Sequence, residues 1–507
     1  MSGVGAARRI GTGDRGAAWL AAAIIGVGTL IRIPQLFHDL VEAYSFRQTQ
    51  TAFTVREYAE HGIDLLASPL PVFGPEANVP MEFPLFQAIA SLLARLGLGA
   101  DLASRLLGLV SFQIAAVLLL LLLRRWFDRT IGVVALVLFE FLPFALLWGA
   151  SSLIDFMSVA LALAMVLFLD KWFAADRGRW WWLAAGAASA ALCALVKITT
   201  FPGWYLLLLA AAIVPLIREG WRAAWLRLLL GLVGAPAVGL AAGIAWTRYA
   251  DAVKGAHEIT AFLTSSALNA WNFGTLDQRL DPGNYAVIGR RIMYEIAGPA
   301  LIGLVLAVLA AILLRGAAAR VRTWGWIAAA LAPPLVFFNL YVVHDYYLIG
   351  VFAAIVGASA IGLVWLWRRW AGWRRLPDWL RSPVVAIVAL LGLGAFTALN
   401  PLGLDEVKQF LRGGEVPQQV VAIDELTRPD DLVVTIGCDW DPTWLYTADR
   451  RGVMFREADA GTFWEDHSVG DYAVLFTCNQ ALDPSEYLPA GARLEATPYP
   501  YLLRIVE

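Results

Sequence analysis

The sequence predicts a polytopic α-helical membrane protein with a small α/β domain at its C-terminal end. Of the 507 residues, 59% are hydrophobic and only 16% are charged. Apolar runs of about 20 residues, enough to cross the hydrocarbon core of a bilayer, recur along most of the chain. After residue 400 the pattern changes to alternating strand-like and helix-like segments. The composition excludes a soluble globular protein, and a net charge of −2 gives no basic field to attract nucleic acid.

About eleven membrane spans are expected from the apolar runs. The first lies at about residues 17–33, and it lacks the short apolar region and A-x-A site of a signal peptide, so we interpret it as a retained span. This gives a cytoplasmic N-terminus at 1–16, a membrane domain at 17–399 and a tail at 400–507. The other spans centre on residues 102–123, 131–148, 156–173, 181–197, 203–217, 228–247, 296–314, 325–342, 346–367 and 383–399.

Lys and Arg residues cluster in alternate connections between these spans, all on the side of the N-terminus. The positive-inside rule makes that side cytoplasmic. An odd number of spans then places the tail outside the cytoplasm, and the Ala-, Leu- and Arg-rich composition suggests a bacterial inner membrane. The basic positions are Arg124, Arg125 and Arg129, then Lys171, Arg177 and Arg179, then Arg218, Arg222 and Arg227, then Arg315, Arg320 and Arg322, and finally the run WRRWAGWRRLPDWLR at 367–381.

Two long loops, 35–87 and 248–295, fall on the outer side. The first is polar but too rich in aromatic and aliphatic residues to be disordered, so we expect it to fold as a cap. Within it, TQTAFTVREYAEHG has helical spacing, PLPVFGPEANVP must be irregular, and PLFQAIASLLARLG is an apolar helix too short to span. In the second loop, HEITAFLTSSALNAWNFGTLDQRL is amphipathic enough to lie at the interface.

The tail is predicted to be a small extracytoplasmic α/β domain, with strands in LVVTI, DYAVLFTC and YLLRIV. Cys438 and Cys478 each follow one of these strands. If the strands are parallel neighbours, the two thiols meet at one edge and can form a disulfide outside the cytoplasm, but unpaired buried thiols fit the sequence equally well. Cys193 lies in a predicted span and should be inert.

Four carboxylates lie at the outer membrane face and are candidates for chemistry: Asp39, Glu42, Glu82 and Asp155. A carboxylate there can accept a proton from a substrate hydroxyl or hold a divalent metal beside a phosphate. The alternative is an ordinary solvated loop acid. That alternative is weaker for Glu82 and Asp155, whose neighbours are apolar, because an ionisable group at a membrane helix end is costly. Glu140 lies in mid-span, where we expect a structural partner.

Three cationic or titratable residues, Arg47, Lys197 and His344, also fall at outer helix ends. An Arg fork and a Lys ammonium both suit a phosphate, although snorkelling to the interface is the alternative for each one alone. Tyr346 and Tyr347 add flat surfaces that suit a sugar, or simply belong to an interfacial aromatic belt. No zinc motif, Walker loop or G-x-G-x-x-G after a strand occurs.

The order of these features resembles the GT-C-fold glycosyltransferases that use polyprenyl-phosphate sugars, which include protein O-mannosyltransferases and lipid A aminoarabinose transferases. In them a segment E-K-P-P-L precedes an apolar helix and a span that starts A-A-R-L. Here Glu82-Phe83-Pro84-Leu85 and Ala103-Ser104-Arg105-Leu106 match that frame, with Phe83 in place of Lys. Asp155 and Lys197 match the family's acid at the fourth span and Lys after the fifth. The resemblance covers roughly residues 17–370.

One departure concerns the base. Better-known members carry an Asp-Glu pair where this chain has Arg47-Gln48. The resemblance therefore implies that Asp39 or Glu42, slightly upstream, takes the role of the missing Asp, or that this subgroup works differently.

The resemblance implies an inverting membrane glycosyltransferase that takes a sugar from a polyprenyl phosphate at the extracytoplasmic face. The acceptor would be a lipid, a glycan or a protein, and the chain would also contact membrane lipids. A divalent metal such as Mg²⁺ or Mn²⁺ is compatible with this chemistry but has no dedicated ligand cluster. The catalytic residues would be Asp39, Asp155 and Glu82, and the donor's phosphate and sugar would bind Arg47, Gln48, Lys197, His344, Tyr346 and Tyr347.

Two other functions are consistent with a polytopic membrane protein. A lipid or polysaccharide transporter would show repeated halves and ionisable residues at the midplane, whereas here no repeat is found and these residues gather at one face. A structural assembly protein would use the membrane region only as an anchor for its tail. The number of spans and the acidic cap argue against that second alternative.

Overall fold

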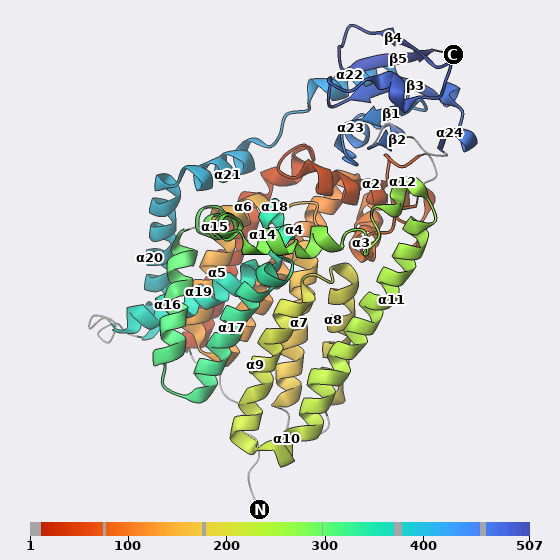
Figure 1. Ribbon diagram of the computed structural model, residues 1–507. Helices are drawn as coiled ribbons and strands as arrows, with labels where there is room; N and C mark the ends of the chain where they lie inside the picture. Colours follow the sequence, from red (N-terminus) through yellow and green to blue (C-terminus); the bar gives the residue numbers. More distant parts are fainter. Residues whose placement is uncertain are drawn as a thin grey trace, which may run out of the picture.

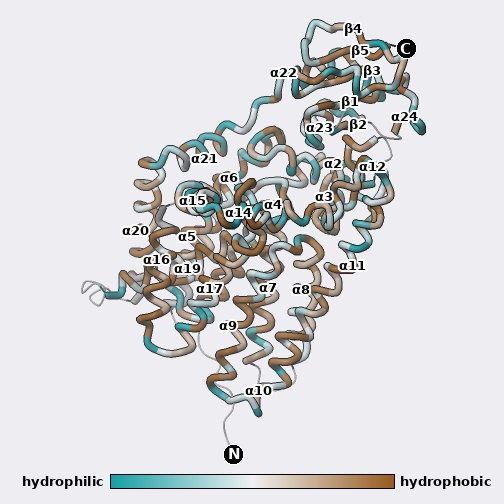
Figure 2. The backbone as a smooth tube through the Cα atoms, in the orientation of Figure 1, coloured by the Kyte–Doolittle hydropathy of each residue, from teal (hydrophilic) through white to brown (hydrophobic). Residues whose placement is uncertain are grey.

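The computed structural model describes residues 12–74, 78–174, 179–296, 298–369, 378–456 and 463–506. Long helices pack side by side in one bundle, short helices lie across one end of it, and the C-terminal sheet extends beyond that end (Figure 1). Hydrophobic residues dominate the long helices, whereas hydrophobic and hydrophilic residues are mixed in the C-terminal domain (Figure 2). Residues 1–11 of the predicted cytoplasmic N-terminus and 370–377 of the last basic cluster lie outside the described residues.

The bundle is a multi-pass membrane domain. Six of its helical segments are long and apolar enough to cross a membrane, or up to eight if two bent pairs each count as one span. All eleven predicted spans fall mainly on helical residues, but α8 has only 17 residues and several others are bent, so the number eleven stays a prediction. The long helices are α1 (Thr12–Arg32), α4 (Ala100–Trp126), α7 (Asp155–Phe173), α8 (Trp180–Val196), α9 (Phe201–Glu219), α10 (Trp221–Leu228) continuing through a π-helical turn into α11 (Ala235–Gly255), α16 (Gly298–Leu313), α17 (Ala317–Val336), α19 (Ile349–Arg369) and α20 (Asp378–Leu399).

The predicted single span at 131–148 is wrong in one respect, because it is two helices. Helix α5 (Arg129–Phe141) ends at Leu142, and α6 (Pro143–Trp148) begins with a proline. Leu142 is extended, with φ −62° and ψ 143°. A proline disfavours the helical conformation in the residue before it and has no N–H for the helix ladder. Apolar periodicity alone does not reveal this break.

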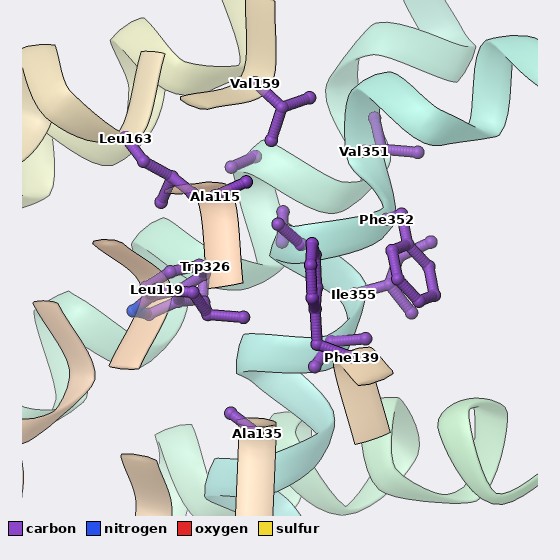
Figure 3. Packing of buried hydrophobic residues seen from close by; sticks show 14 of the residues in the cluster. Ala115, Leu119, Ala135, Phe139, Val159, Leu163, Trp326, Val351, Phe352 and Ile355 are labelled. Carbon is purple, nitrogen blue, oxygen red and sulfur yellow. The ribbon is translucent and has the colours of Figure 1, made fainter. Parts of the chain in front are cut away.

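The centre of the bundle is closely packed around α19. Residues 349–362 of this helix are buried all round, as expected of a helix that is apolar on every face. Phe352 packs against Phe139 of α5 with ring centroids 5.1 Å apart, and Trp326 of α17 lies in the same cluster (Figure 3). Apart from Ser359, the side chains of residues 349–362 are apolar.

A fully buried ion pair inside this bundle joins α1 to α5. Arg32 contacts Glu140 with 3.2 Å between Nη1 and Oε2, and both side chains are fully buried. The guanidinium also donates to the carbonyls of Glu140 at 2.6 Å and Ala145 at 3.0 Å. Helix α1 can approach because residue 28 is glycine; a Cβ there would lie 2.1 Å from the carboxylate. The structural partner expected for Glu140 is therefore Arg32.

Predicted cytoplasmic basic residues meet at the end of the bundle away from the short helices. Arg125 of α4 and Arg322 of α17 both pair with Asp170 of α7. Arg368 of α19 pairs with Asp128, which precedes α5, at 2.8 Å. These contacts place four of the connections on one side, as the charge pattern predicts, while the identity of that side stays a prediction.

The two long outer loops form the layer of short helices. The helix predicted after Thr49 is α2, and the short apolar helix is α3 followed by a π-helical turn, both as expected. Described residues between α2 and α3 form only turns and isolated bridges. The elements of this layer are a 3-10 turn (Pro34–Phe37), α2 (Ser45–His61), α3 (Leu85–Leu93), α12 (Glu258–Ala261), α13 (Asn269–Phe273), α14 (Leu276–Leu280), α15 (Pro282–Arg291), a π-helical turn (Ile292–Ile296), α18 (Phe338–Val343) and a 3-10 turn (Tyr346–Leu348).

The C-terminal domain contains a five-stranded mixed sheet of order β2-β1-β3-β5-β4. The first three strands of that order are parallel, and β5 and β4 are antiparallel. Because β1 and β3 are parallel neighbours, Cys438 and Cys478 meet at one edge, where they form a disulfide. The elements are α21 (Pro401–Arg412), α22 (Gln418–Leu426), β1 (Leu432–Ile436), α23 (Thr443–Thr447), β2 (Arg451–Phe455), α24 (Phe463–Asp466), β3 (Tyr472–Thr477), β4 (Arg493–Ala496) and β5 (Leu502–Val506).

The outer loop also extends this sheet. The amides of Gly452 and Met454 in β2 donate to the carbonyls of Pro71 and Val72, both at 2.8 Å, and the Gly74 amide donates to Gly452 at 2.8 Å. Residues 71–74 therefore lie along the outer edge of β2. This contact fixes the C-terminal domain over the outer layer of the membrane domain.

Candidate functional site

A cavity of about 630 Å³ lies where the outer layer meets the C-terminal domain. Six remote parts of the chain supply its wall: the start of α2, the segment before α3, the end of α8, the 262–272 region, the residues after α18, and the C-terminal domain. Its lining includes Tyr44, Phe46, Arg47, Met81, Glu82, Lys197, Phe262, Trp271, His344, Tyr346, Tyr347, Asp439, Trp440 and Arg456. The convergence of outer segments predicted from the topology is thus present in the structure.

The first ion pair of the cavity wall joins α2 to the segment before α3. Arg47 Nη2 lies 2.7 Å from Glu82 Oε1, and Nη1 donates to Gln50 at 2.8 Å. Burial opposes the charge on the guanidinium, but the Glu82 carboxylate together with Tyr346, Tyr347 and Asp155 outweighs burial and raises the pKa of Arg47. Burial likewise opposes the charge on Glu82, while Arg47 and Lys197 lower its pKa. Both groups are therefore charged at neutral pH.

The second ion pair joins α8 to α7. Lys197 follows the last residue of α8, and its Nζ lies 2.6 Å from Asp155 Oδ1 at the first residue of α7. Both side chains are almost completely buried. The ammonium also lies over the rings of Tyr347 and Tyr346, at 4.5 and 5.1 Å from their centroids. A buried ammonium over two aromatic faces is held as a cation by its carboxylate and the ring quadrupoles.

Backbone contacts hold the two pairs together. The amide of Phe83 donates to the carbonyl of Leu195 at 3.0 Å, which places Glu82 beside the end of α8. Trp246 of α11 donates to the carbonyl of Met81 at 3.0 Å, and its ring meets Phe83 edge to face at 5.0 Å. Phe83, which replaces a Lys of the family frame, therefore packs as an anchor for this segment rather than supplying charge.

His344 lies on the same wall, directly after α18. Its Nδ1 shares a hydrogen bond with the hydroxyl of Tyr44. Its ring is 5.6 Å from that of Trp271, 5.5 Å from Tyr346 and 5.9 Å from Tyr347. Burial and the positive charges of nearby arginines and Lys197 lower the pKa of His344 to about 4. The imidazole is neutral at pH 7, so it offers no positive charge to a phosphate.

The C-terminal domain closes the opposite wall with residues that the sequence analysis did not single out. Trp440 meets Phe46 edge to face with centroids 4.8 Å apart. Asp439 and Arg456 line the cavity beside it, 3.5 Å apart between Oδ1 and Nε. The run GCDWDPTW, with acids and tryptophans directly after a strand, was the available signal. Tyr44 and Trp271 were missed as well.

Other predicted residues are placed differently. Asp39 is exposed and lines a second cavity of about 630 Å³ together with Arg56 and Asp101, so it does not meet Glu82 or Asp155. Gln48 is buried away from the main cavity. Its amide donates to the carbonyl of Ala43 at 2.8 Å and accepts from the Ser152 amide at 3.0 Å, which braces α2.

Glu42, the other candidate for the missing acid, is a structural partner. It pairs with Arg105 of α4 at 2.8 Å, and both side chains are buried. Arg105 belongs to the A-S-R-L motif, and it also donates to the carbonyls of His38 and Asp39 at 3.0 Å each. This motif therefore holds the entrance of the outer loop against α4.

The site carboxylates do not form a metal-binding set. Glu82 and Asp155 each face a cation, so a divalent ion would have to displace Arg47 or Lys197. Among the described residues, one group has the spacing of metal ligands, formed by Glu57, Glu60 and His61 on α2. Arg451 already neutralises Glu57 at 2.5 Å, and this group lies outside the cavity lining. We therefore assign no step of the chemistry to Mg²⁺ or Mn²⁺.

Comparison with known proteins agrees with this geometry. Residues 78–246, which include Glu82, Asp155 and Lys197, match the model of the dolichyl-phosphate-mannose-protein mannosyltransferase family. No curated protein sequence matches the chain. The fold, in contrast, matches solved structures over almost its full length.

Two of these structures are informative. ArnT from Cupriavidus metallidurans, solved with bound undecaprenyl phosphate, has a TM-score of 0.63 at 15% identity and covers 96% of this chain and 98% of its own. The oligosaccharyltransferase AglB from Archaeoglobus fulgidus, in complex with an inhibitory peptide and a dolichol-phosphate, has a TM-score of 0.53 at 12% identity, covering 91% of this chain and 69% of its own. At these identities the likeness shows the fold alone.

The family match over residues 78–246 and the overall fold both agree with the resemblance to the GT-C-fold glycosyltransferases that was inferred from the sequence. Within this class, its segment 78–246 matches the dolichyl-phosphate-mannose-protein mannosyltransferase family, and its overall fold is similar to that of ArnT.

Proposed function

We propose that the protein transfers a sugar from a polyprenyl phosphate to an acceptor hydroxyl at the extracytoplasmic face, with inversion at the anomeric carbon. The observation that carries this proposal is the pair of cations, partly buried Arg47 and buried Lys197, on the wall of one large cavity. The ligands of ArnT and AglB, undecaprenyl phosphate and dolichol-phosphate, are lipids of the required chemical class. The charge pattern of the connections supports the extracytoplasmic orientation.

The cations act on the leaving group. In the transfer, the bond between the anomeric carbon and the phosphate oxygen breaks, and negative charge develops on the polyprenyl phosphate. Arg47 retains N–H donors beyond those bonded to Glu82 and Gln50, and Lys197 is a point charge beside it. Because Glu82 and Asp155 hold these groups in position before the reaction, charge on the phosphate is stabilised without reorganisation.

The aromatic residues suit the sugar. Tyr346, Tyr347, Trp271 and Trp440 present ring faces and edges to the cavity, and Asp439 and Arg456 add hydrogen-bonding groups. Sugars have apolar C–H faces and polar edges, so a mixed wall of this kind matches them. Arg47, Lys197, Tyr346 and Tyr347 thus remain the proposed donor site, and Glu82 and Asp155 are proposed to orient its cations.

A transporter is less consistent with the site. Glu140, the acid found deep in the bundle, is fully buried against Arg32 and faces no cavity among the described residues. The ionisable groups that do face a cavity lie at one end of the bundle. They are arranged for chemistry at that end and do not mark a path through the membrane.

The proposed function is tested by native mass spectrometry of the detergent-purified protein with added undecaprenyl phosphate. We expect one bound lipid phosphate, with affinity reduced in Arg47→Ala. The matched control is Arg56→Ala, because Arg56 also lies on α2 and pairs with a carboxylate, Asp449 at 2.6 Å, but faces the other cavity. Equal binding by both variants and the wild type, or binding of bulk phospholipid only, would contradict the proposal.

A further inference from the structure

The proposed transfer needs a group that accepts the proton of the acceptor hydroxyl, and the carboxylates of the cavity are already engaged. Glu82 is paired with Arg47, and Asp439 with Arg456. Asp155, behind the wall, is paired with Lys197. A carboxylate that forms an ion pair with a neighbouring cation is a weak base, because that cation stabilises its ionised form. Where the resembling family has an Asp-Glu pair, this chain has Arg47-Gln48, and the Arg47 guanidinium cannot act as a base.

Among the described residues that line the cavity, His344 is the one histidine, and its imidazole has no ion-pair partner there. One ring nitrogen, Nδ1, is bonded to the Tyr44 hydroxyl, which leaves Nε2 for a substrate. Trp271, Tyr346 and Tyr347 surround the ring and fix its orientation. A nitrogen base held by a hydrogen bond at its other nitrogen is the arrangement that general-base catalysis requires.

Tyr44 links this imidazole to the phosphate-binding residue. It caps α2 in a left-handed conformation with φ 52°, and its carbonyl accepts the amide of Arg47 at 3.1 Å. The backbone turn that starts α2 therefore places the Tyr44 hydroxyl at His344 and the Arg47 guanidinium at Glu82. Burial is the main cause of a raised pKa for Tyr44, so its hydroxyl stays neutral. The hydroxyl oxygen can therefore accept a hydrogen bond from the Nδ1–H group of the imidazole.

We propose that His344 is the general base of the transfer, replacing the carboxylate whose position Arg47 occupies, with Tyr44 as its positioning residue. This inference rests on the proposed function. As the acceptor oxygen bonds to the anomeric carbon, its proton passes to His344 Nε2, and the electrons of the broken C–O bond remain on the polyprenyl phosphate. The imidazolium is stabilised by the Tyr44 oxygen and then returns its proton to solvent.

Donor binding should activate this base. The groups around the ring are Tyr44 before α2, Arg47 on α2, Lys197 after α8, Arg291 on α15, and Asp345, Tyr346 and Tyr347 after α18. Burial and the three cations keep the pKa of His344 low in the free protein. A phosphate placed against Arg47 and Lys197 offsets two of those charges, so the pKa rises toward the range in which an imidazole is an effective base.

The pH dependence of the transfer rate follows from the direction in which the pKa of His344 shifts. His344 acts as a base only when it is neutral, so the rate should fall as pH drops below its pKa. For kcat/KM, which reports the free enzyme, the acidic limb should lie near pH 4. For kcat, which reports the donor complex, the limb should lie at higher pH. Arg47 and Lys197 also lower the pKa of Glu82, so a bound phosphate would shift a Glu82 limb in the same direction, and the titration has to be followed at the His344 signal itself.

The closing experiment is NMR titration of ¹³C-labelled histidines, with and without undecaprenyl phosphate. The chain has five His residues, and His344→Gln identifies the relevant signal. We expect this signal to titrate well below the ordinary value and to move upward on lipid binding, while His467 in the C-terminal domain stays unchanged. A signal that is already protonated at pH 7, or one that ignores the lipid, overturns the inference.

Activity is followed by ³¹P NMR as conversion of polyprenyl-linked sugar phosphodiesters, extracted from the source membranes, into phosphate monoesters. His344→Gln should slow conversion by about 10²- to 10⁴-fold and bind undecaprenyl phosphate as well as the wild type does. Tyr44→Phe should slow it by a smaller factor. Unchanged conversion in His344→Gln removes its role as a base, and lost lipid binding makes it a phosphate ligand instead. Failure of the wild type to bind the lipid refutes the proposed function itself.

Discussion

Two buried ion pairs, Arg32–Glu140 and Lys197–Asp155, each connect two helices of the bundle but differ in what surrounds them. In the first, Nη1 and Nη2 of the guanidinium contact backbone carbonyls and the carboxylate, and no described cavity borders it. In the second, the ammonium also lies over Tyr347 and lines the main cavity. Burial of a charged pair is therefore no mark of function by itself. What distinguishes the second pair is its access to space that a ligand can fill.

Breaking the inner pair should have the largest effect, and it should act on stability. Arg32→Met leaves Glu140 in the bundle without a counter-charge, which is expected to cost about 3–5 kcal/mol of unfolding free energy. The double variant Arg32→Met/Glu140→Met should recover most of this loss, because no unpaired charge remains. Thermal unfolding in detergent measures both. A single variant with full stability but reduced transfer would place this pair in the mechanism and remove the contrast.

Breaking the cavity pair should act mainly on the reaction. Lys197→Met is expected to slow transfer by about 10²- to 10³-fold, the usual effect of removing one preorganised group that stabilises developing charge. The control is Lys171→Met, because Lys171 also lies over an aromatic ring, 4.1 Å from that of Trp182, but at the other end of α7. The rate of phosphate monoester release measures both variants. Similar rates in the two would mean that the position of Lys197 gives it no special role.

A smaller effect is expected at the cavity wall formed by the C-terminal domain. Trp440→Ala removes an aromatic contact of about 0.5–1.5 kcal/mol, so the donor KM should rise by about two- to twelvefold. Trp444→Ala is the control, because Trp444 packs on Phe476 inside the domain, with centroids 5.5 Å apart. Donor kinetics at saturating acceptor give the comparison. If Trp444→Ala raises KM as much, the effect comes from the domain as a whole.

The sequence was most informative where the membrane limits the conformations of the chain. A span has a nearly fixed length, so Asp155 at the start of one and Lys197 at the end of another had to reach the same face, and they pair there. The sequence also predicted that Arg47 and Glu82 lie at the outer face, because few polar residues occur at those helix ends, and both line the main cavity. The break at Leu142 could have been read from Pro143, since the residue before a proline avoids the helix.

The sequence was least informative where the backbone turns. Asp39 and Arg47 are close along the chain, but the left-handed residue Tyr44 lies between them, and the two end at different cavities. Spacing alone could not show that Asp39 faces away from Glu82. Likewise, the contribution of Asp439 and Trp440 depends on how the C-terminal domain docks, and no local pattern encodes docking. The site therefore combines residues fixed by helix ends with residues fixed by tertiary contacts.

The contact between residues 71–74 and strand β2 has a consequence for biosynthesis. The segment that covers this edge is translated long before the strand that it covers. Until β2 has been translated, the earlier segment has no strand to bind. A C-terminal domain produced on its own would expose the β2 edge, which can pair with other chains and aggregate. The outer loop and the C-terminal domain therefore have to reach the same side of the membrane before the edge of β2 can be covered.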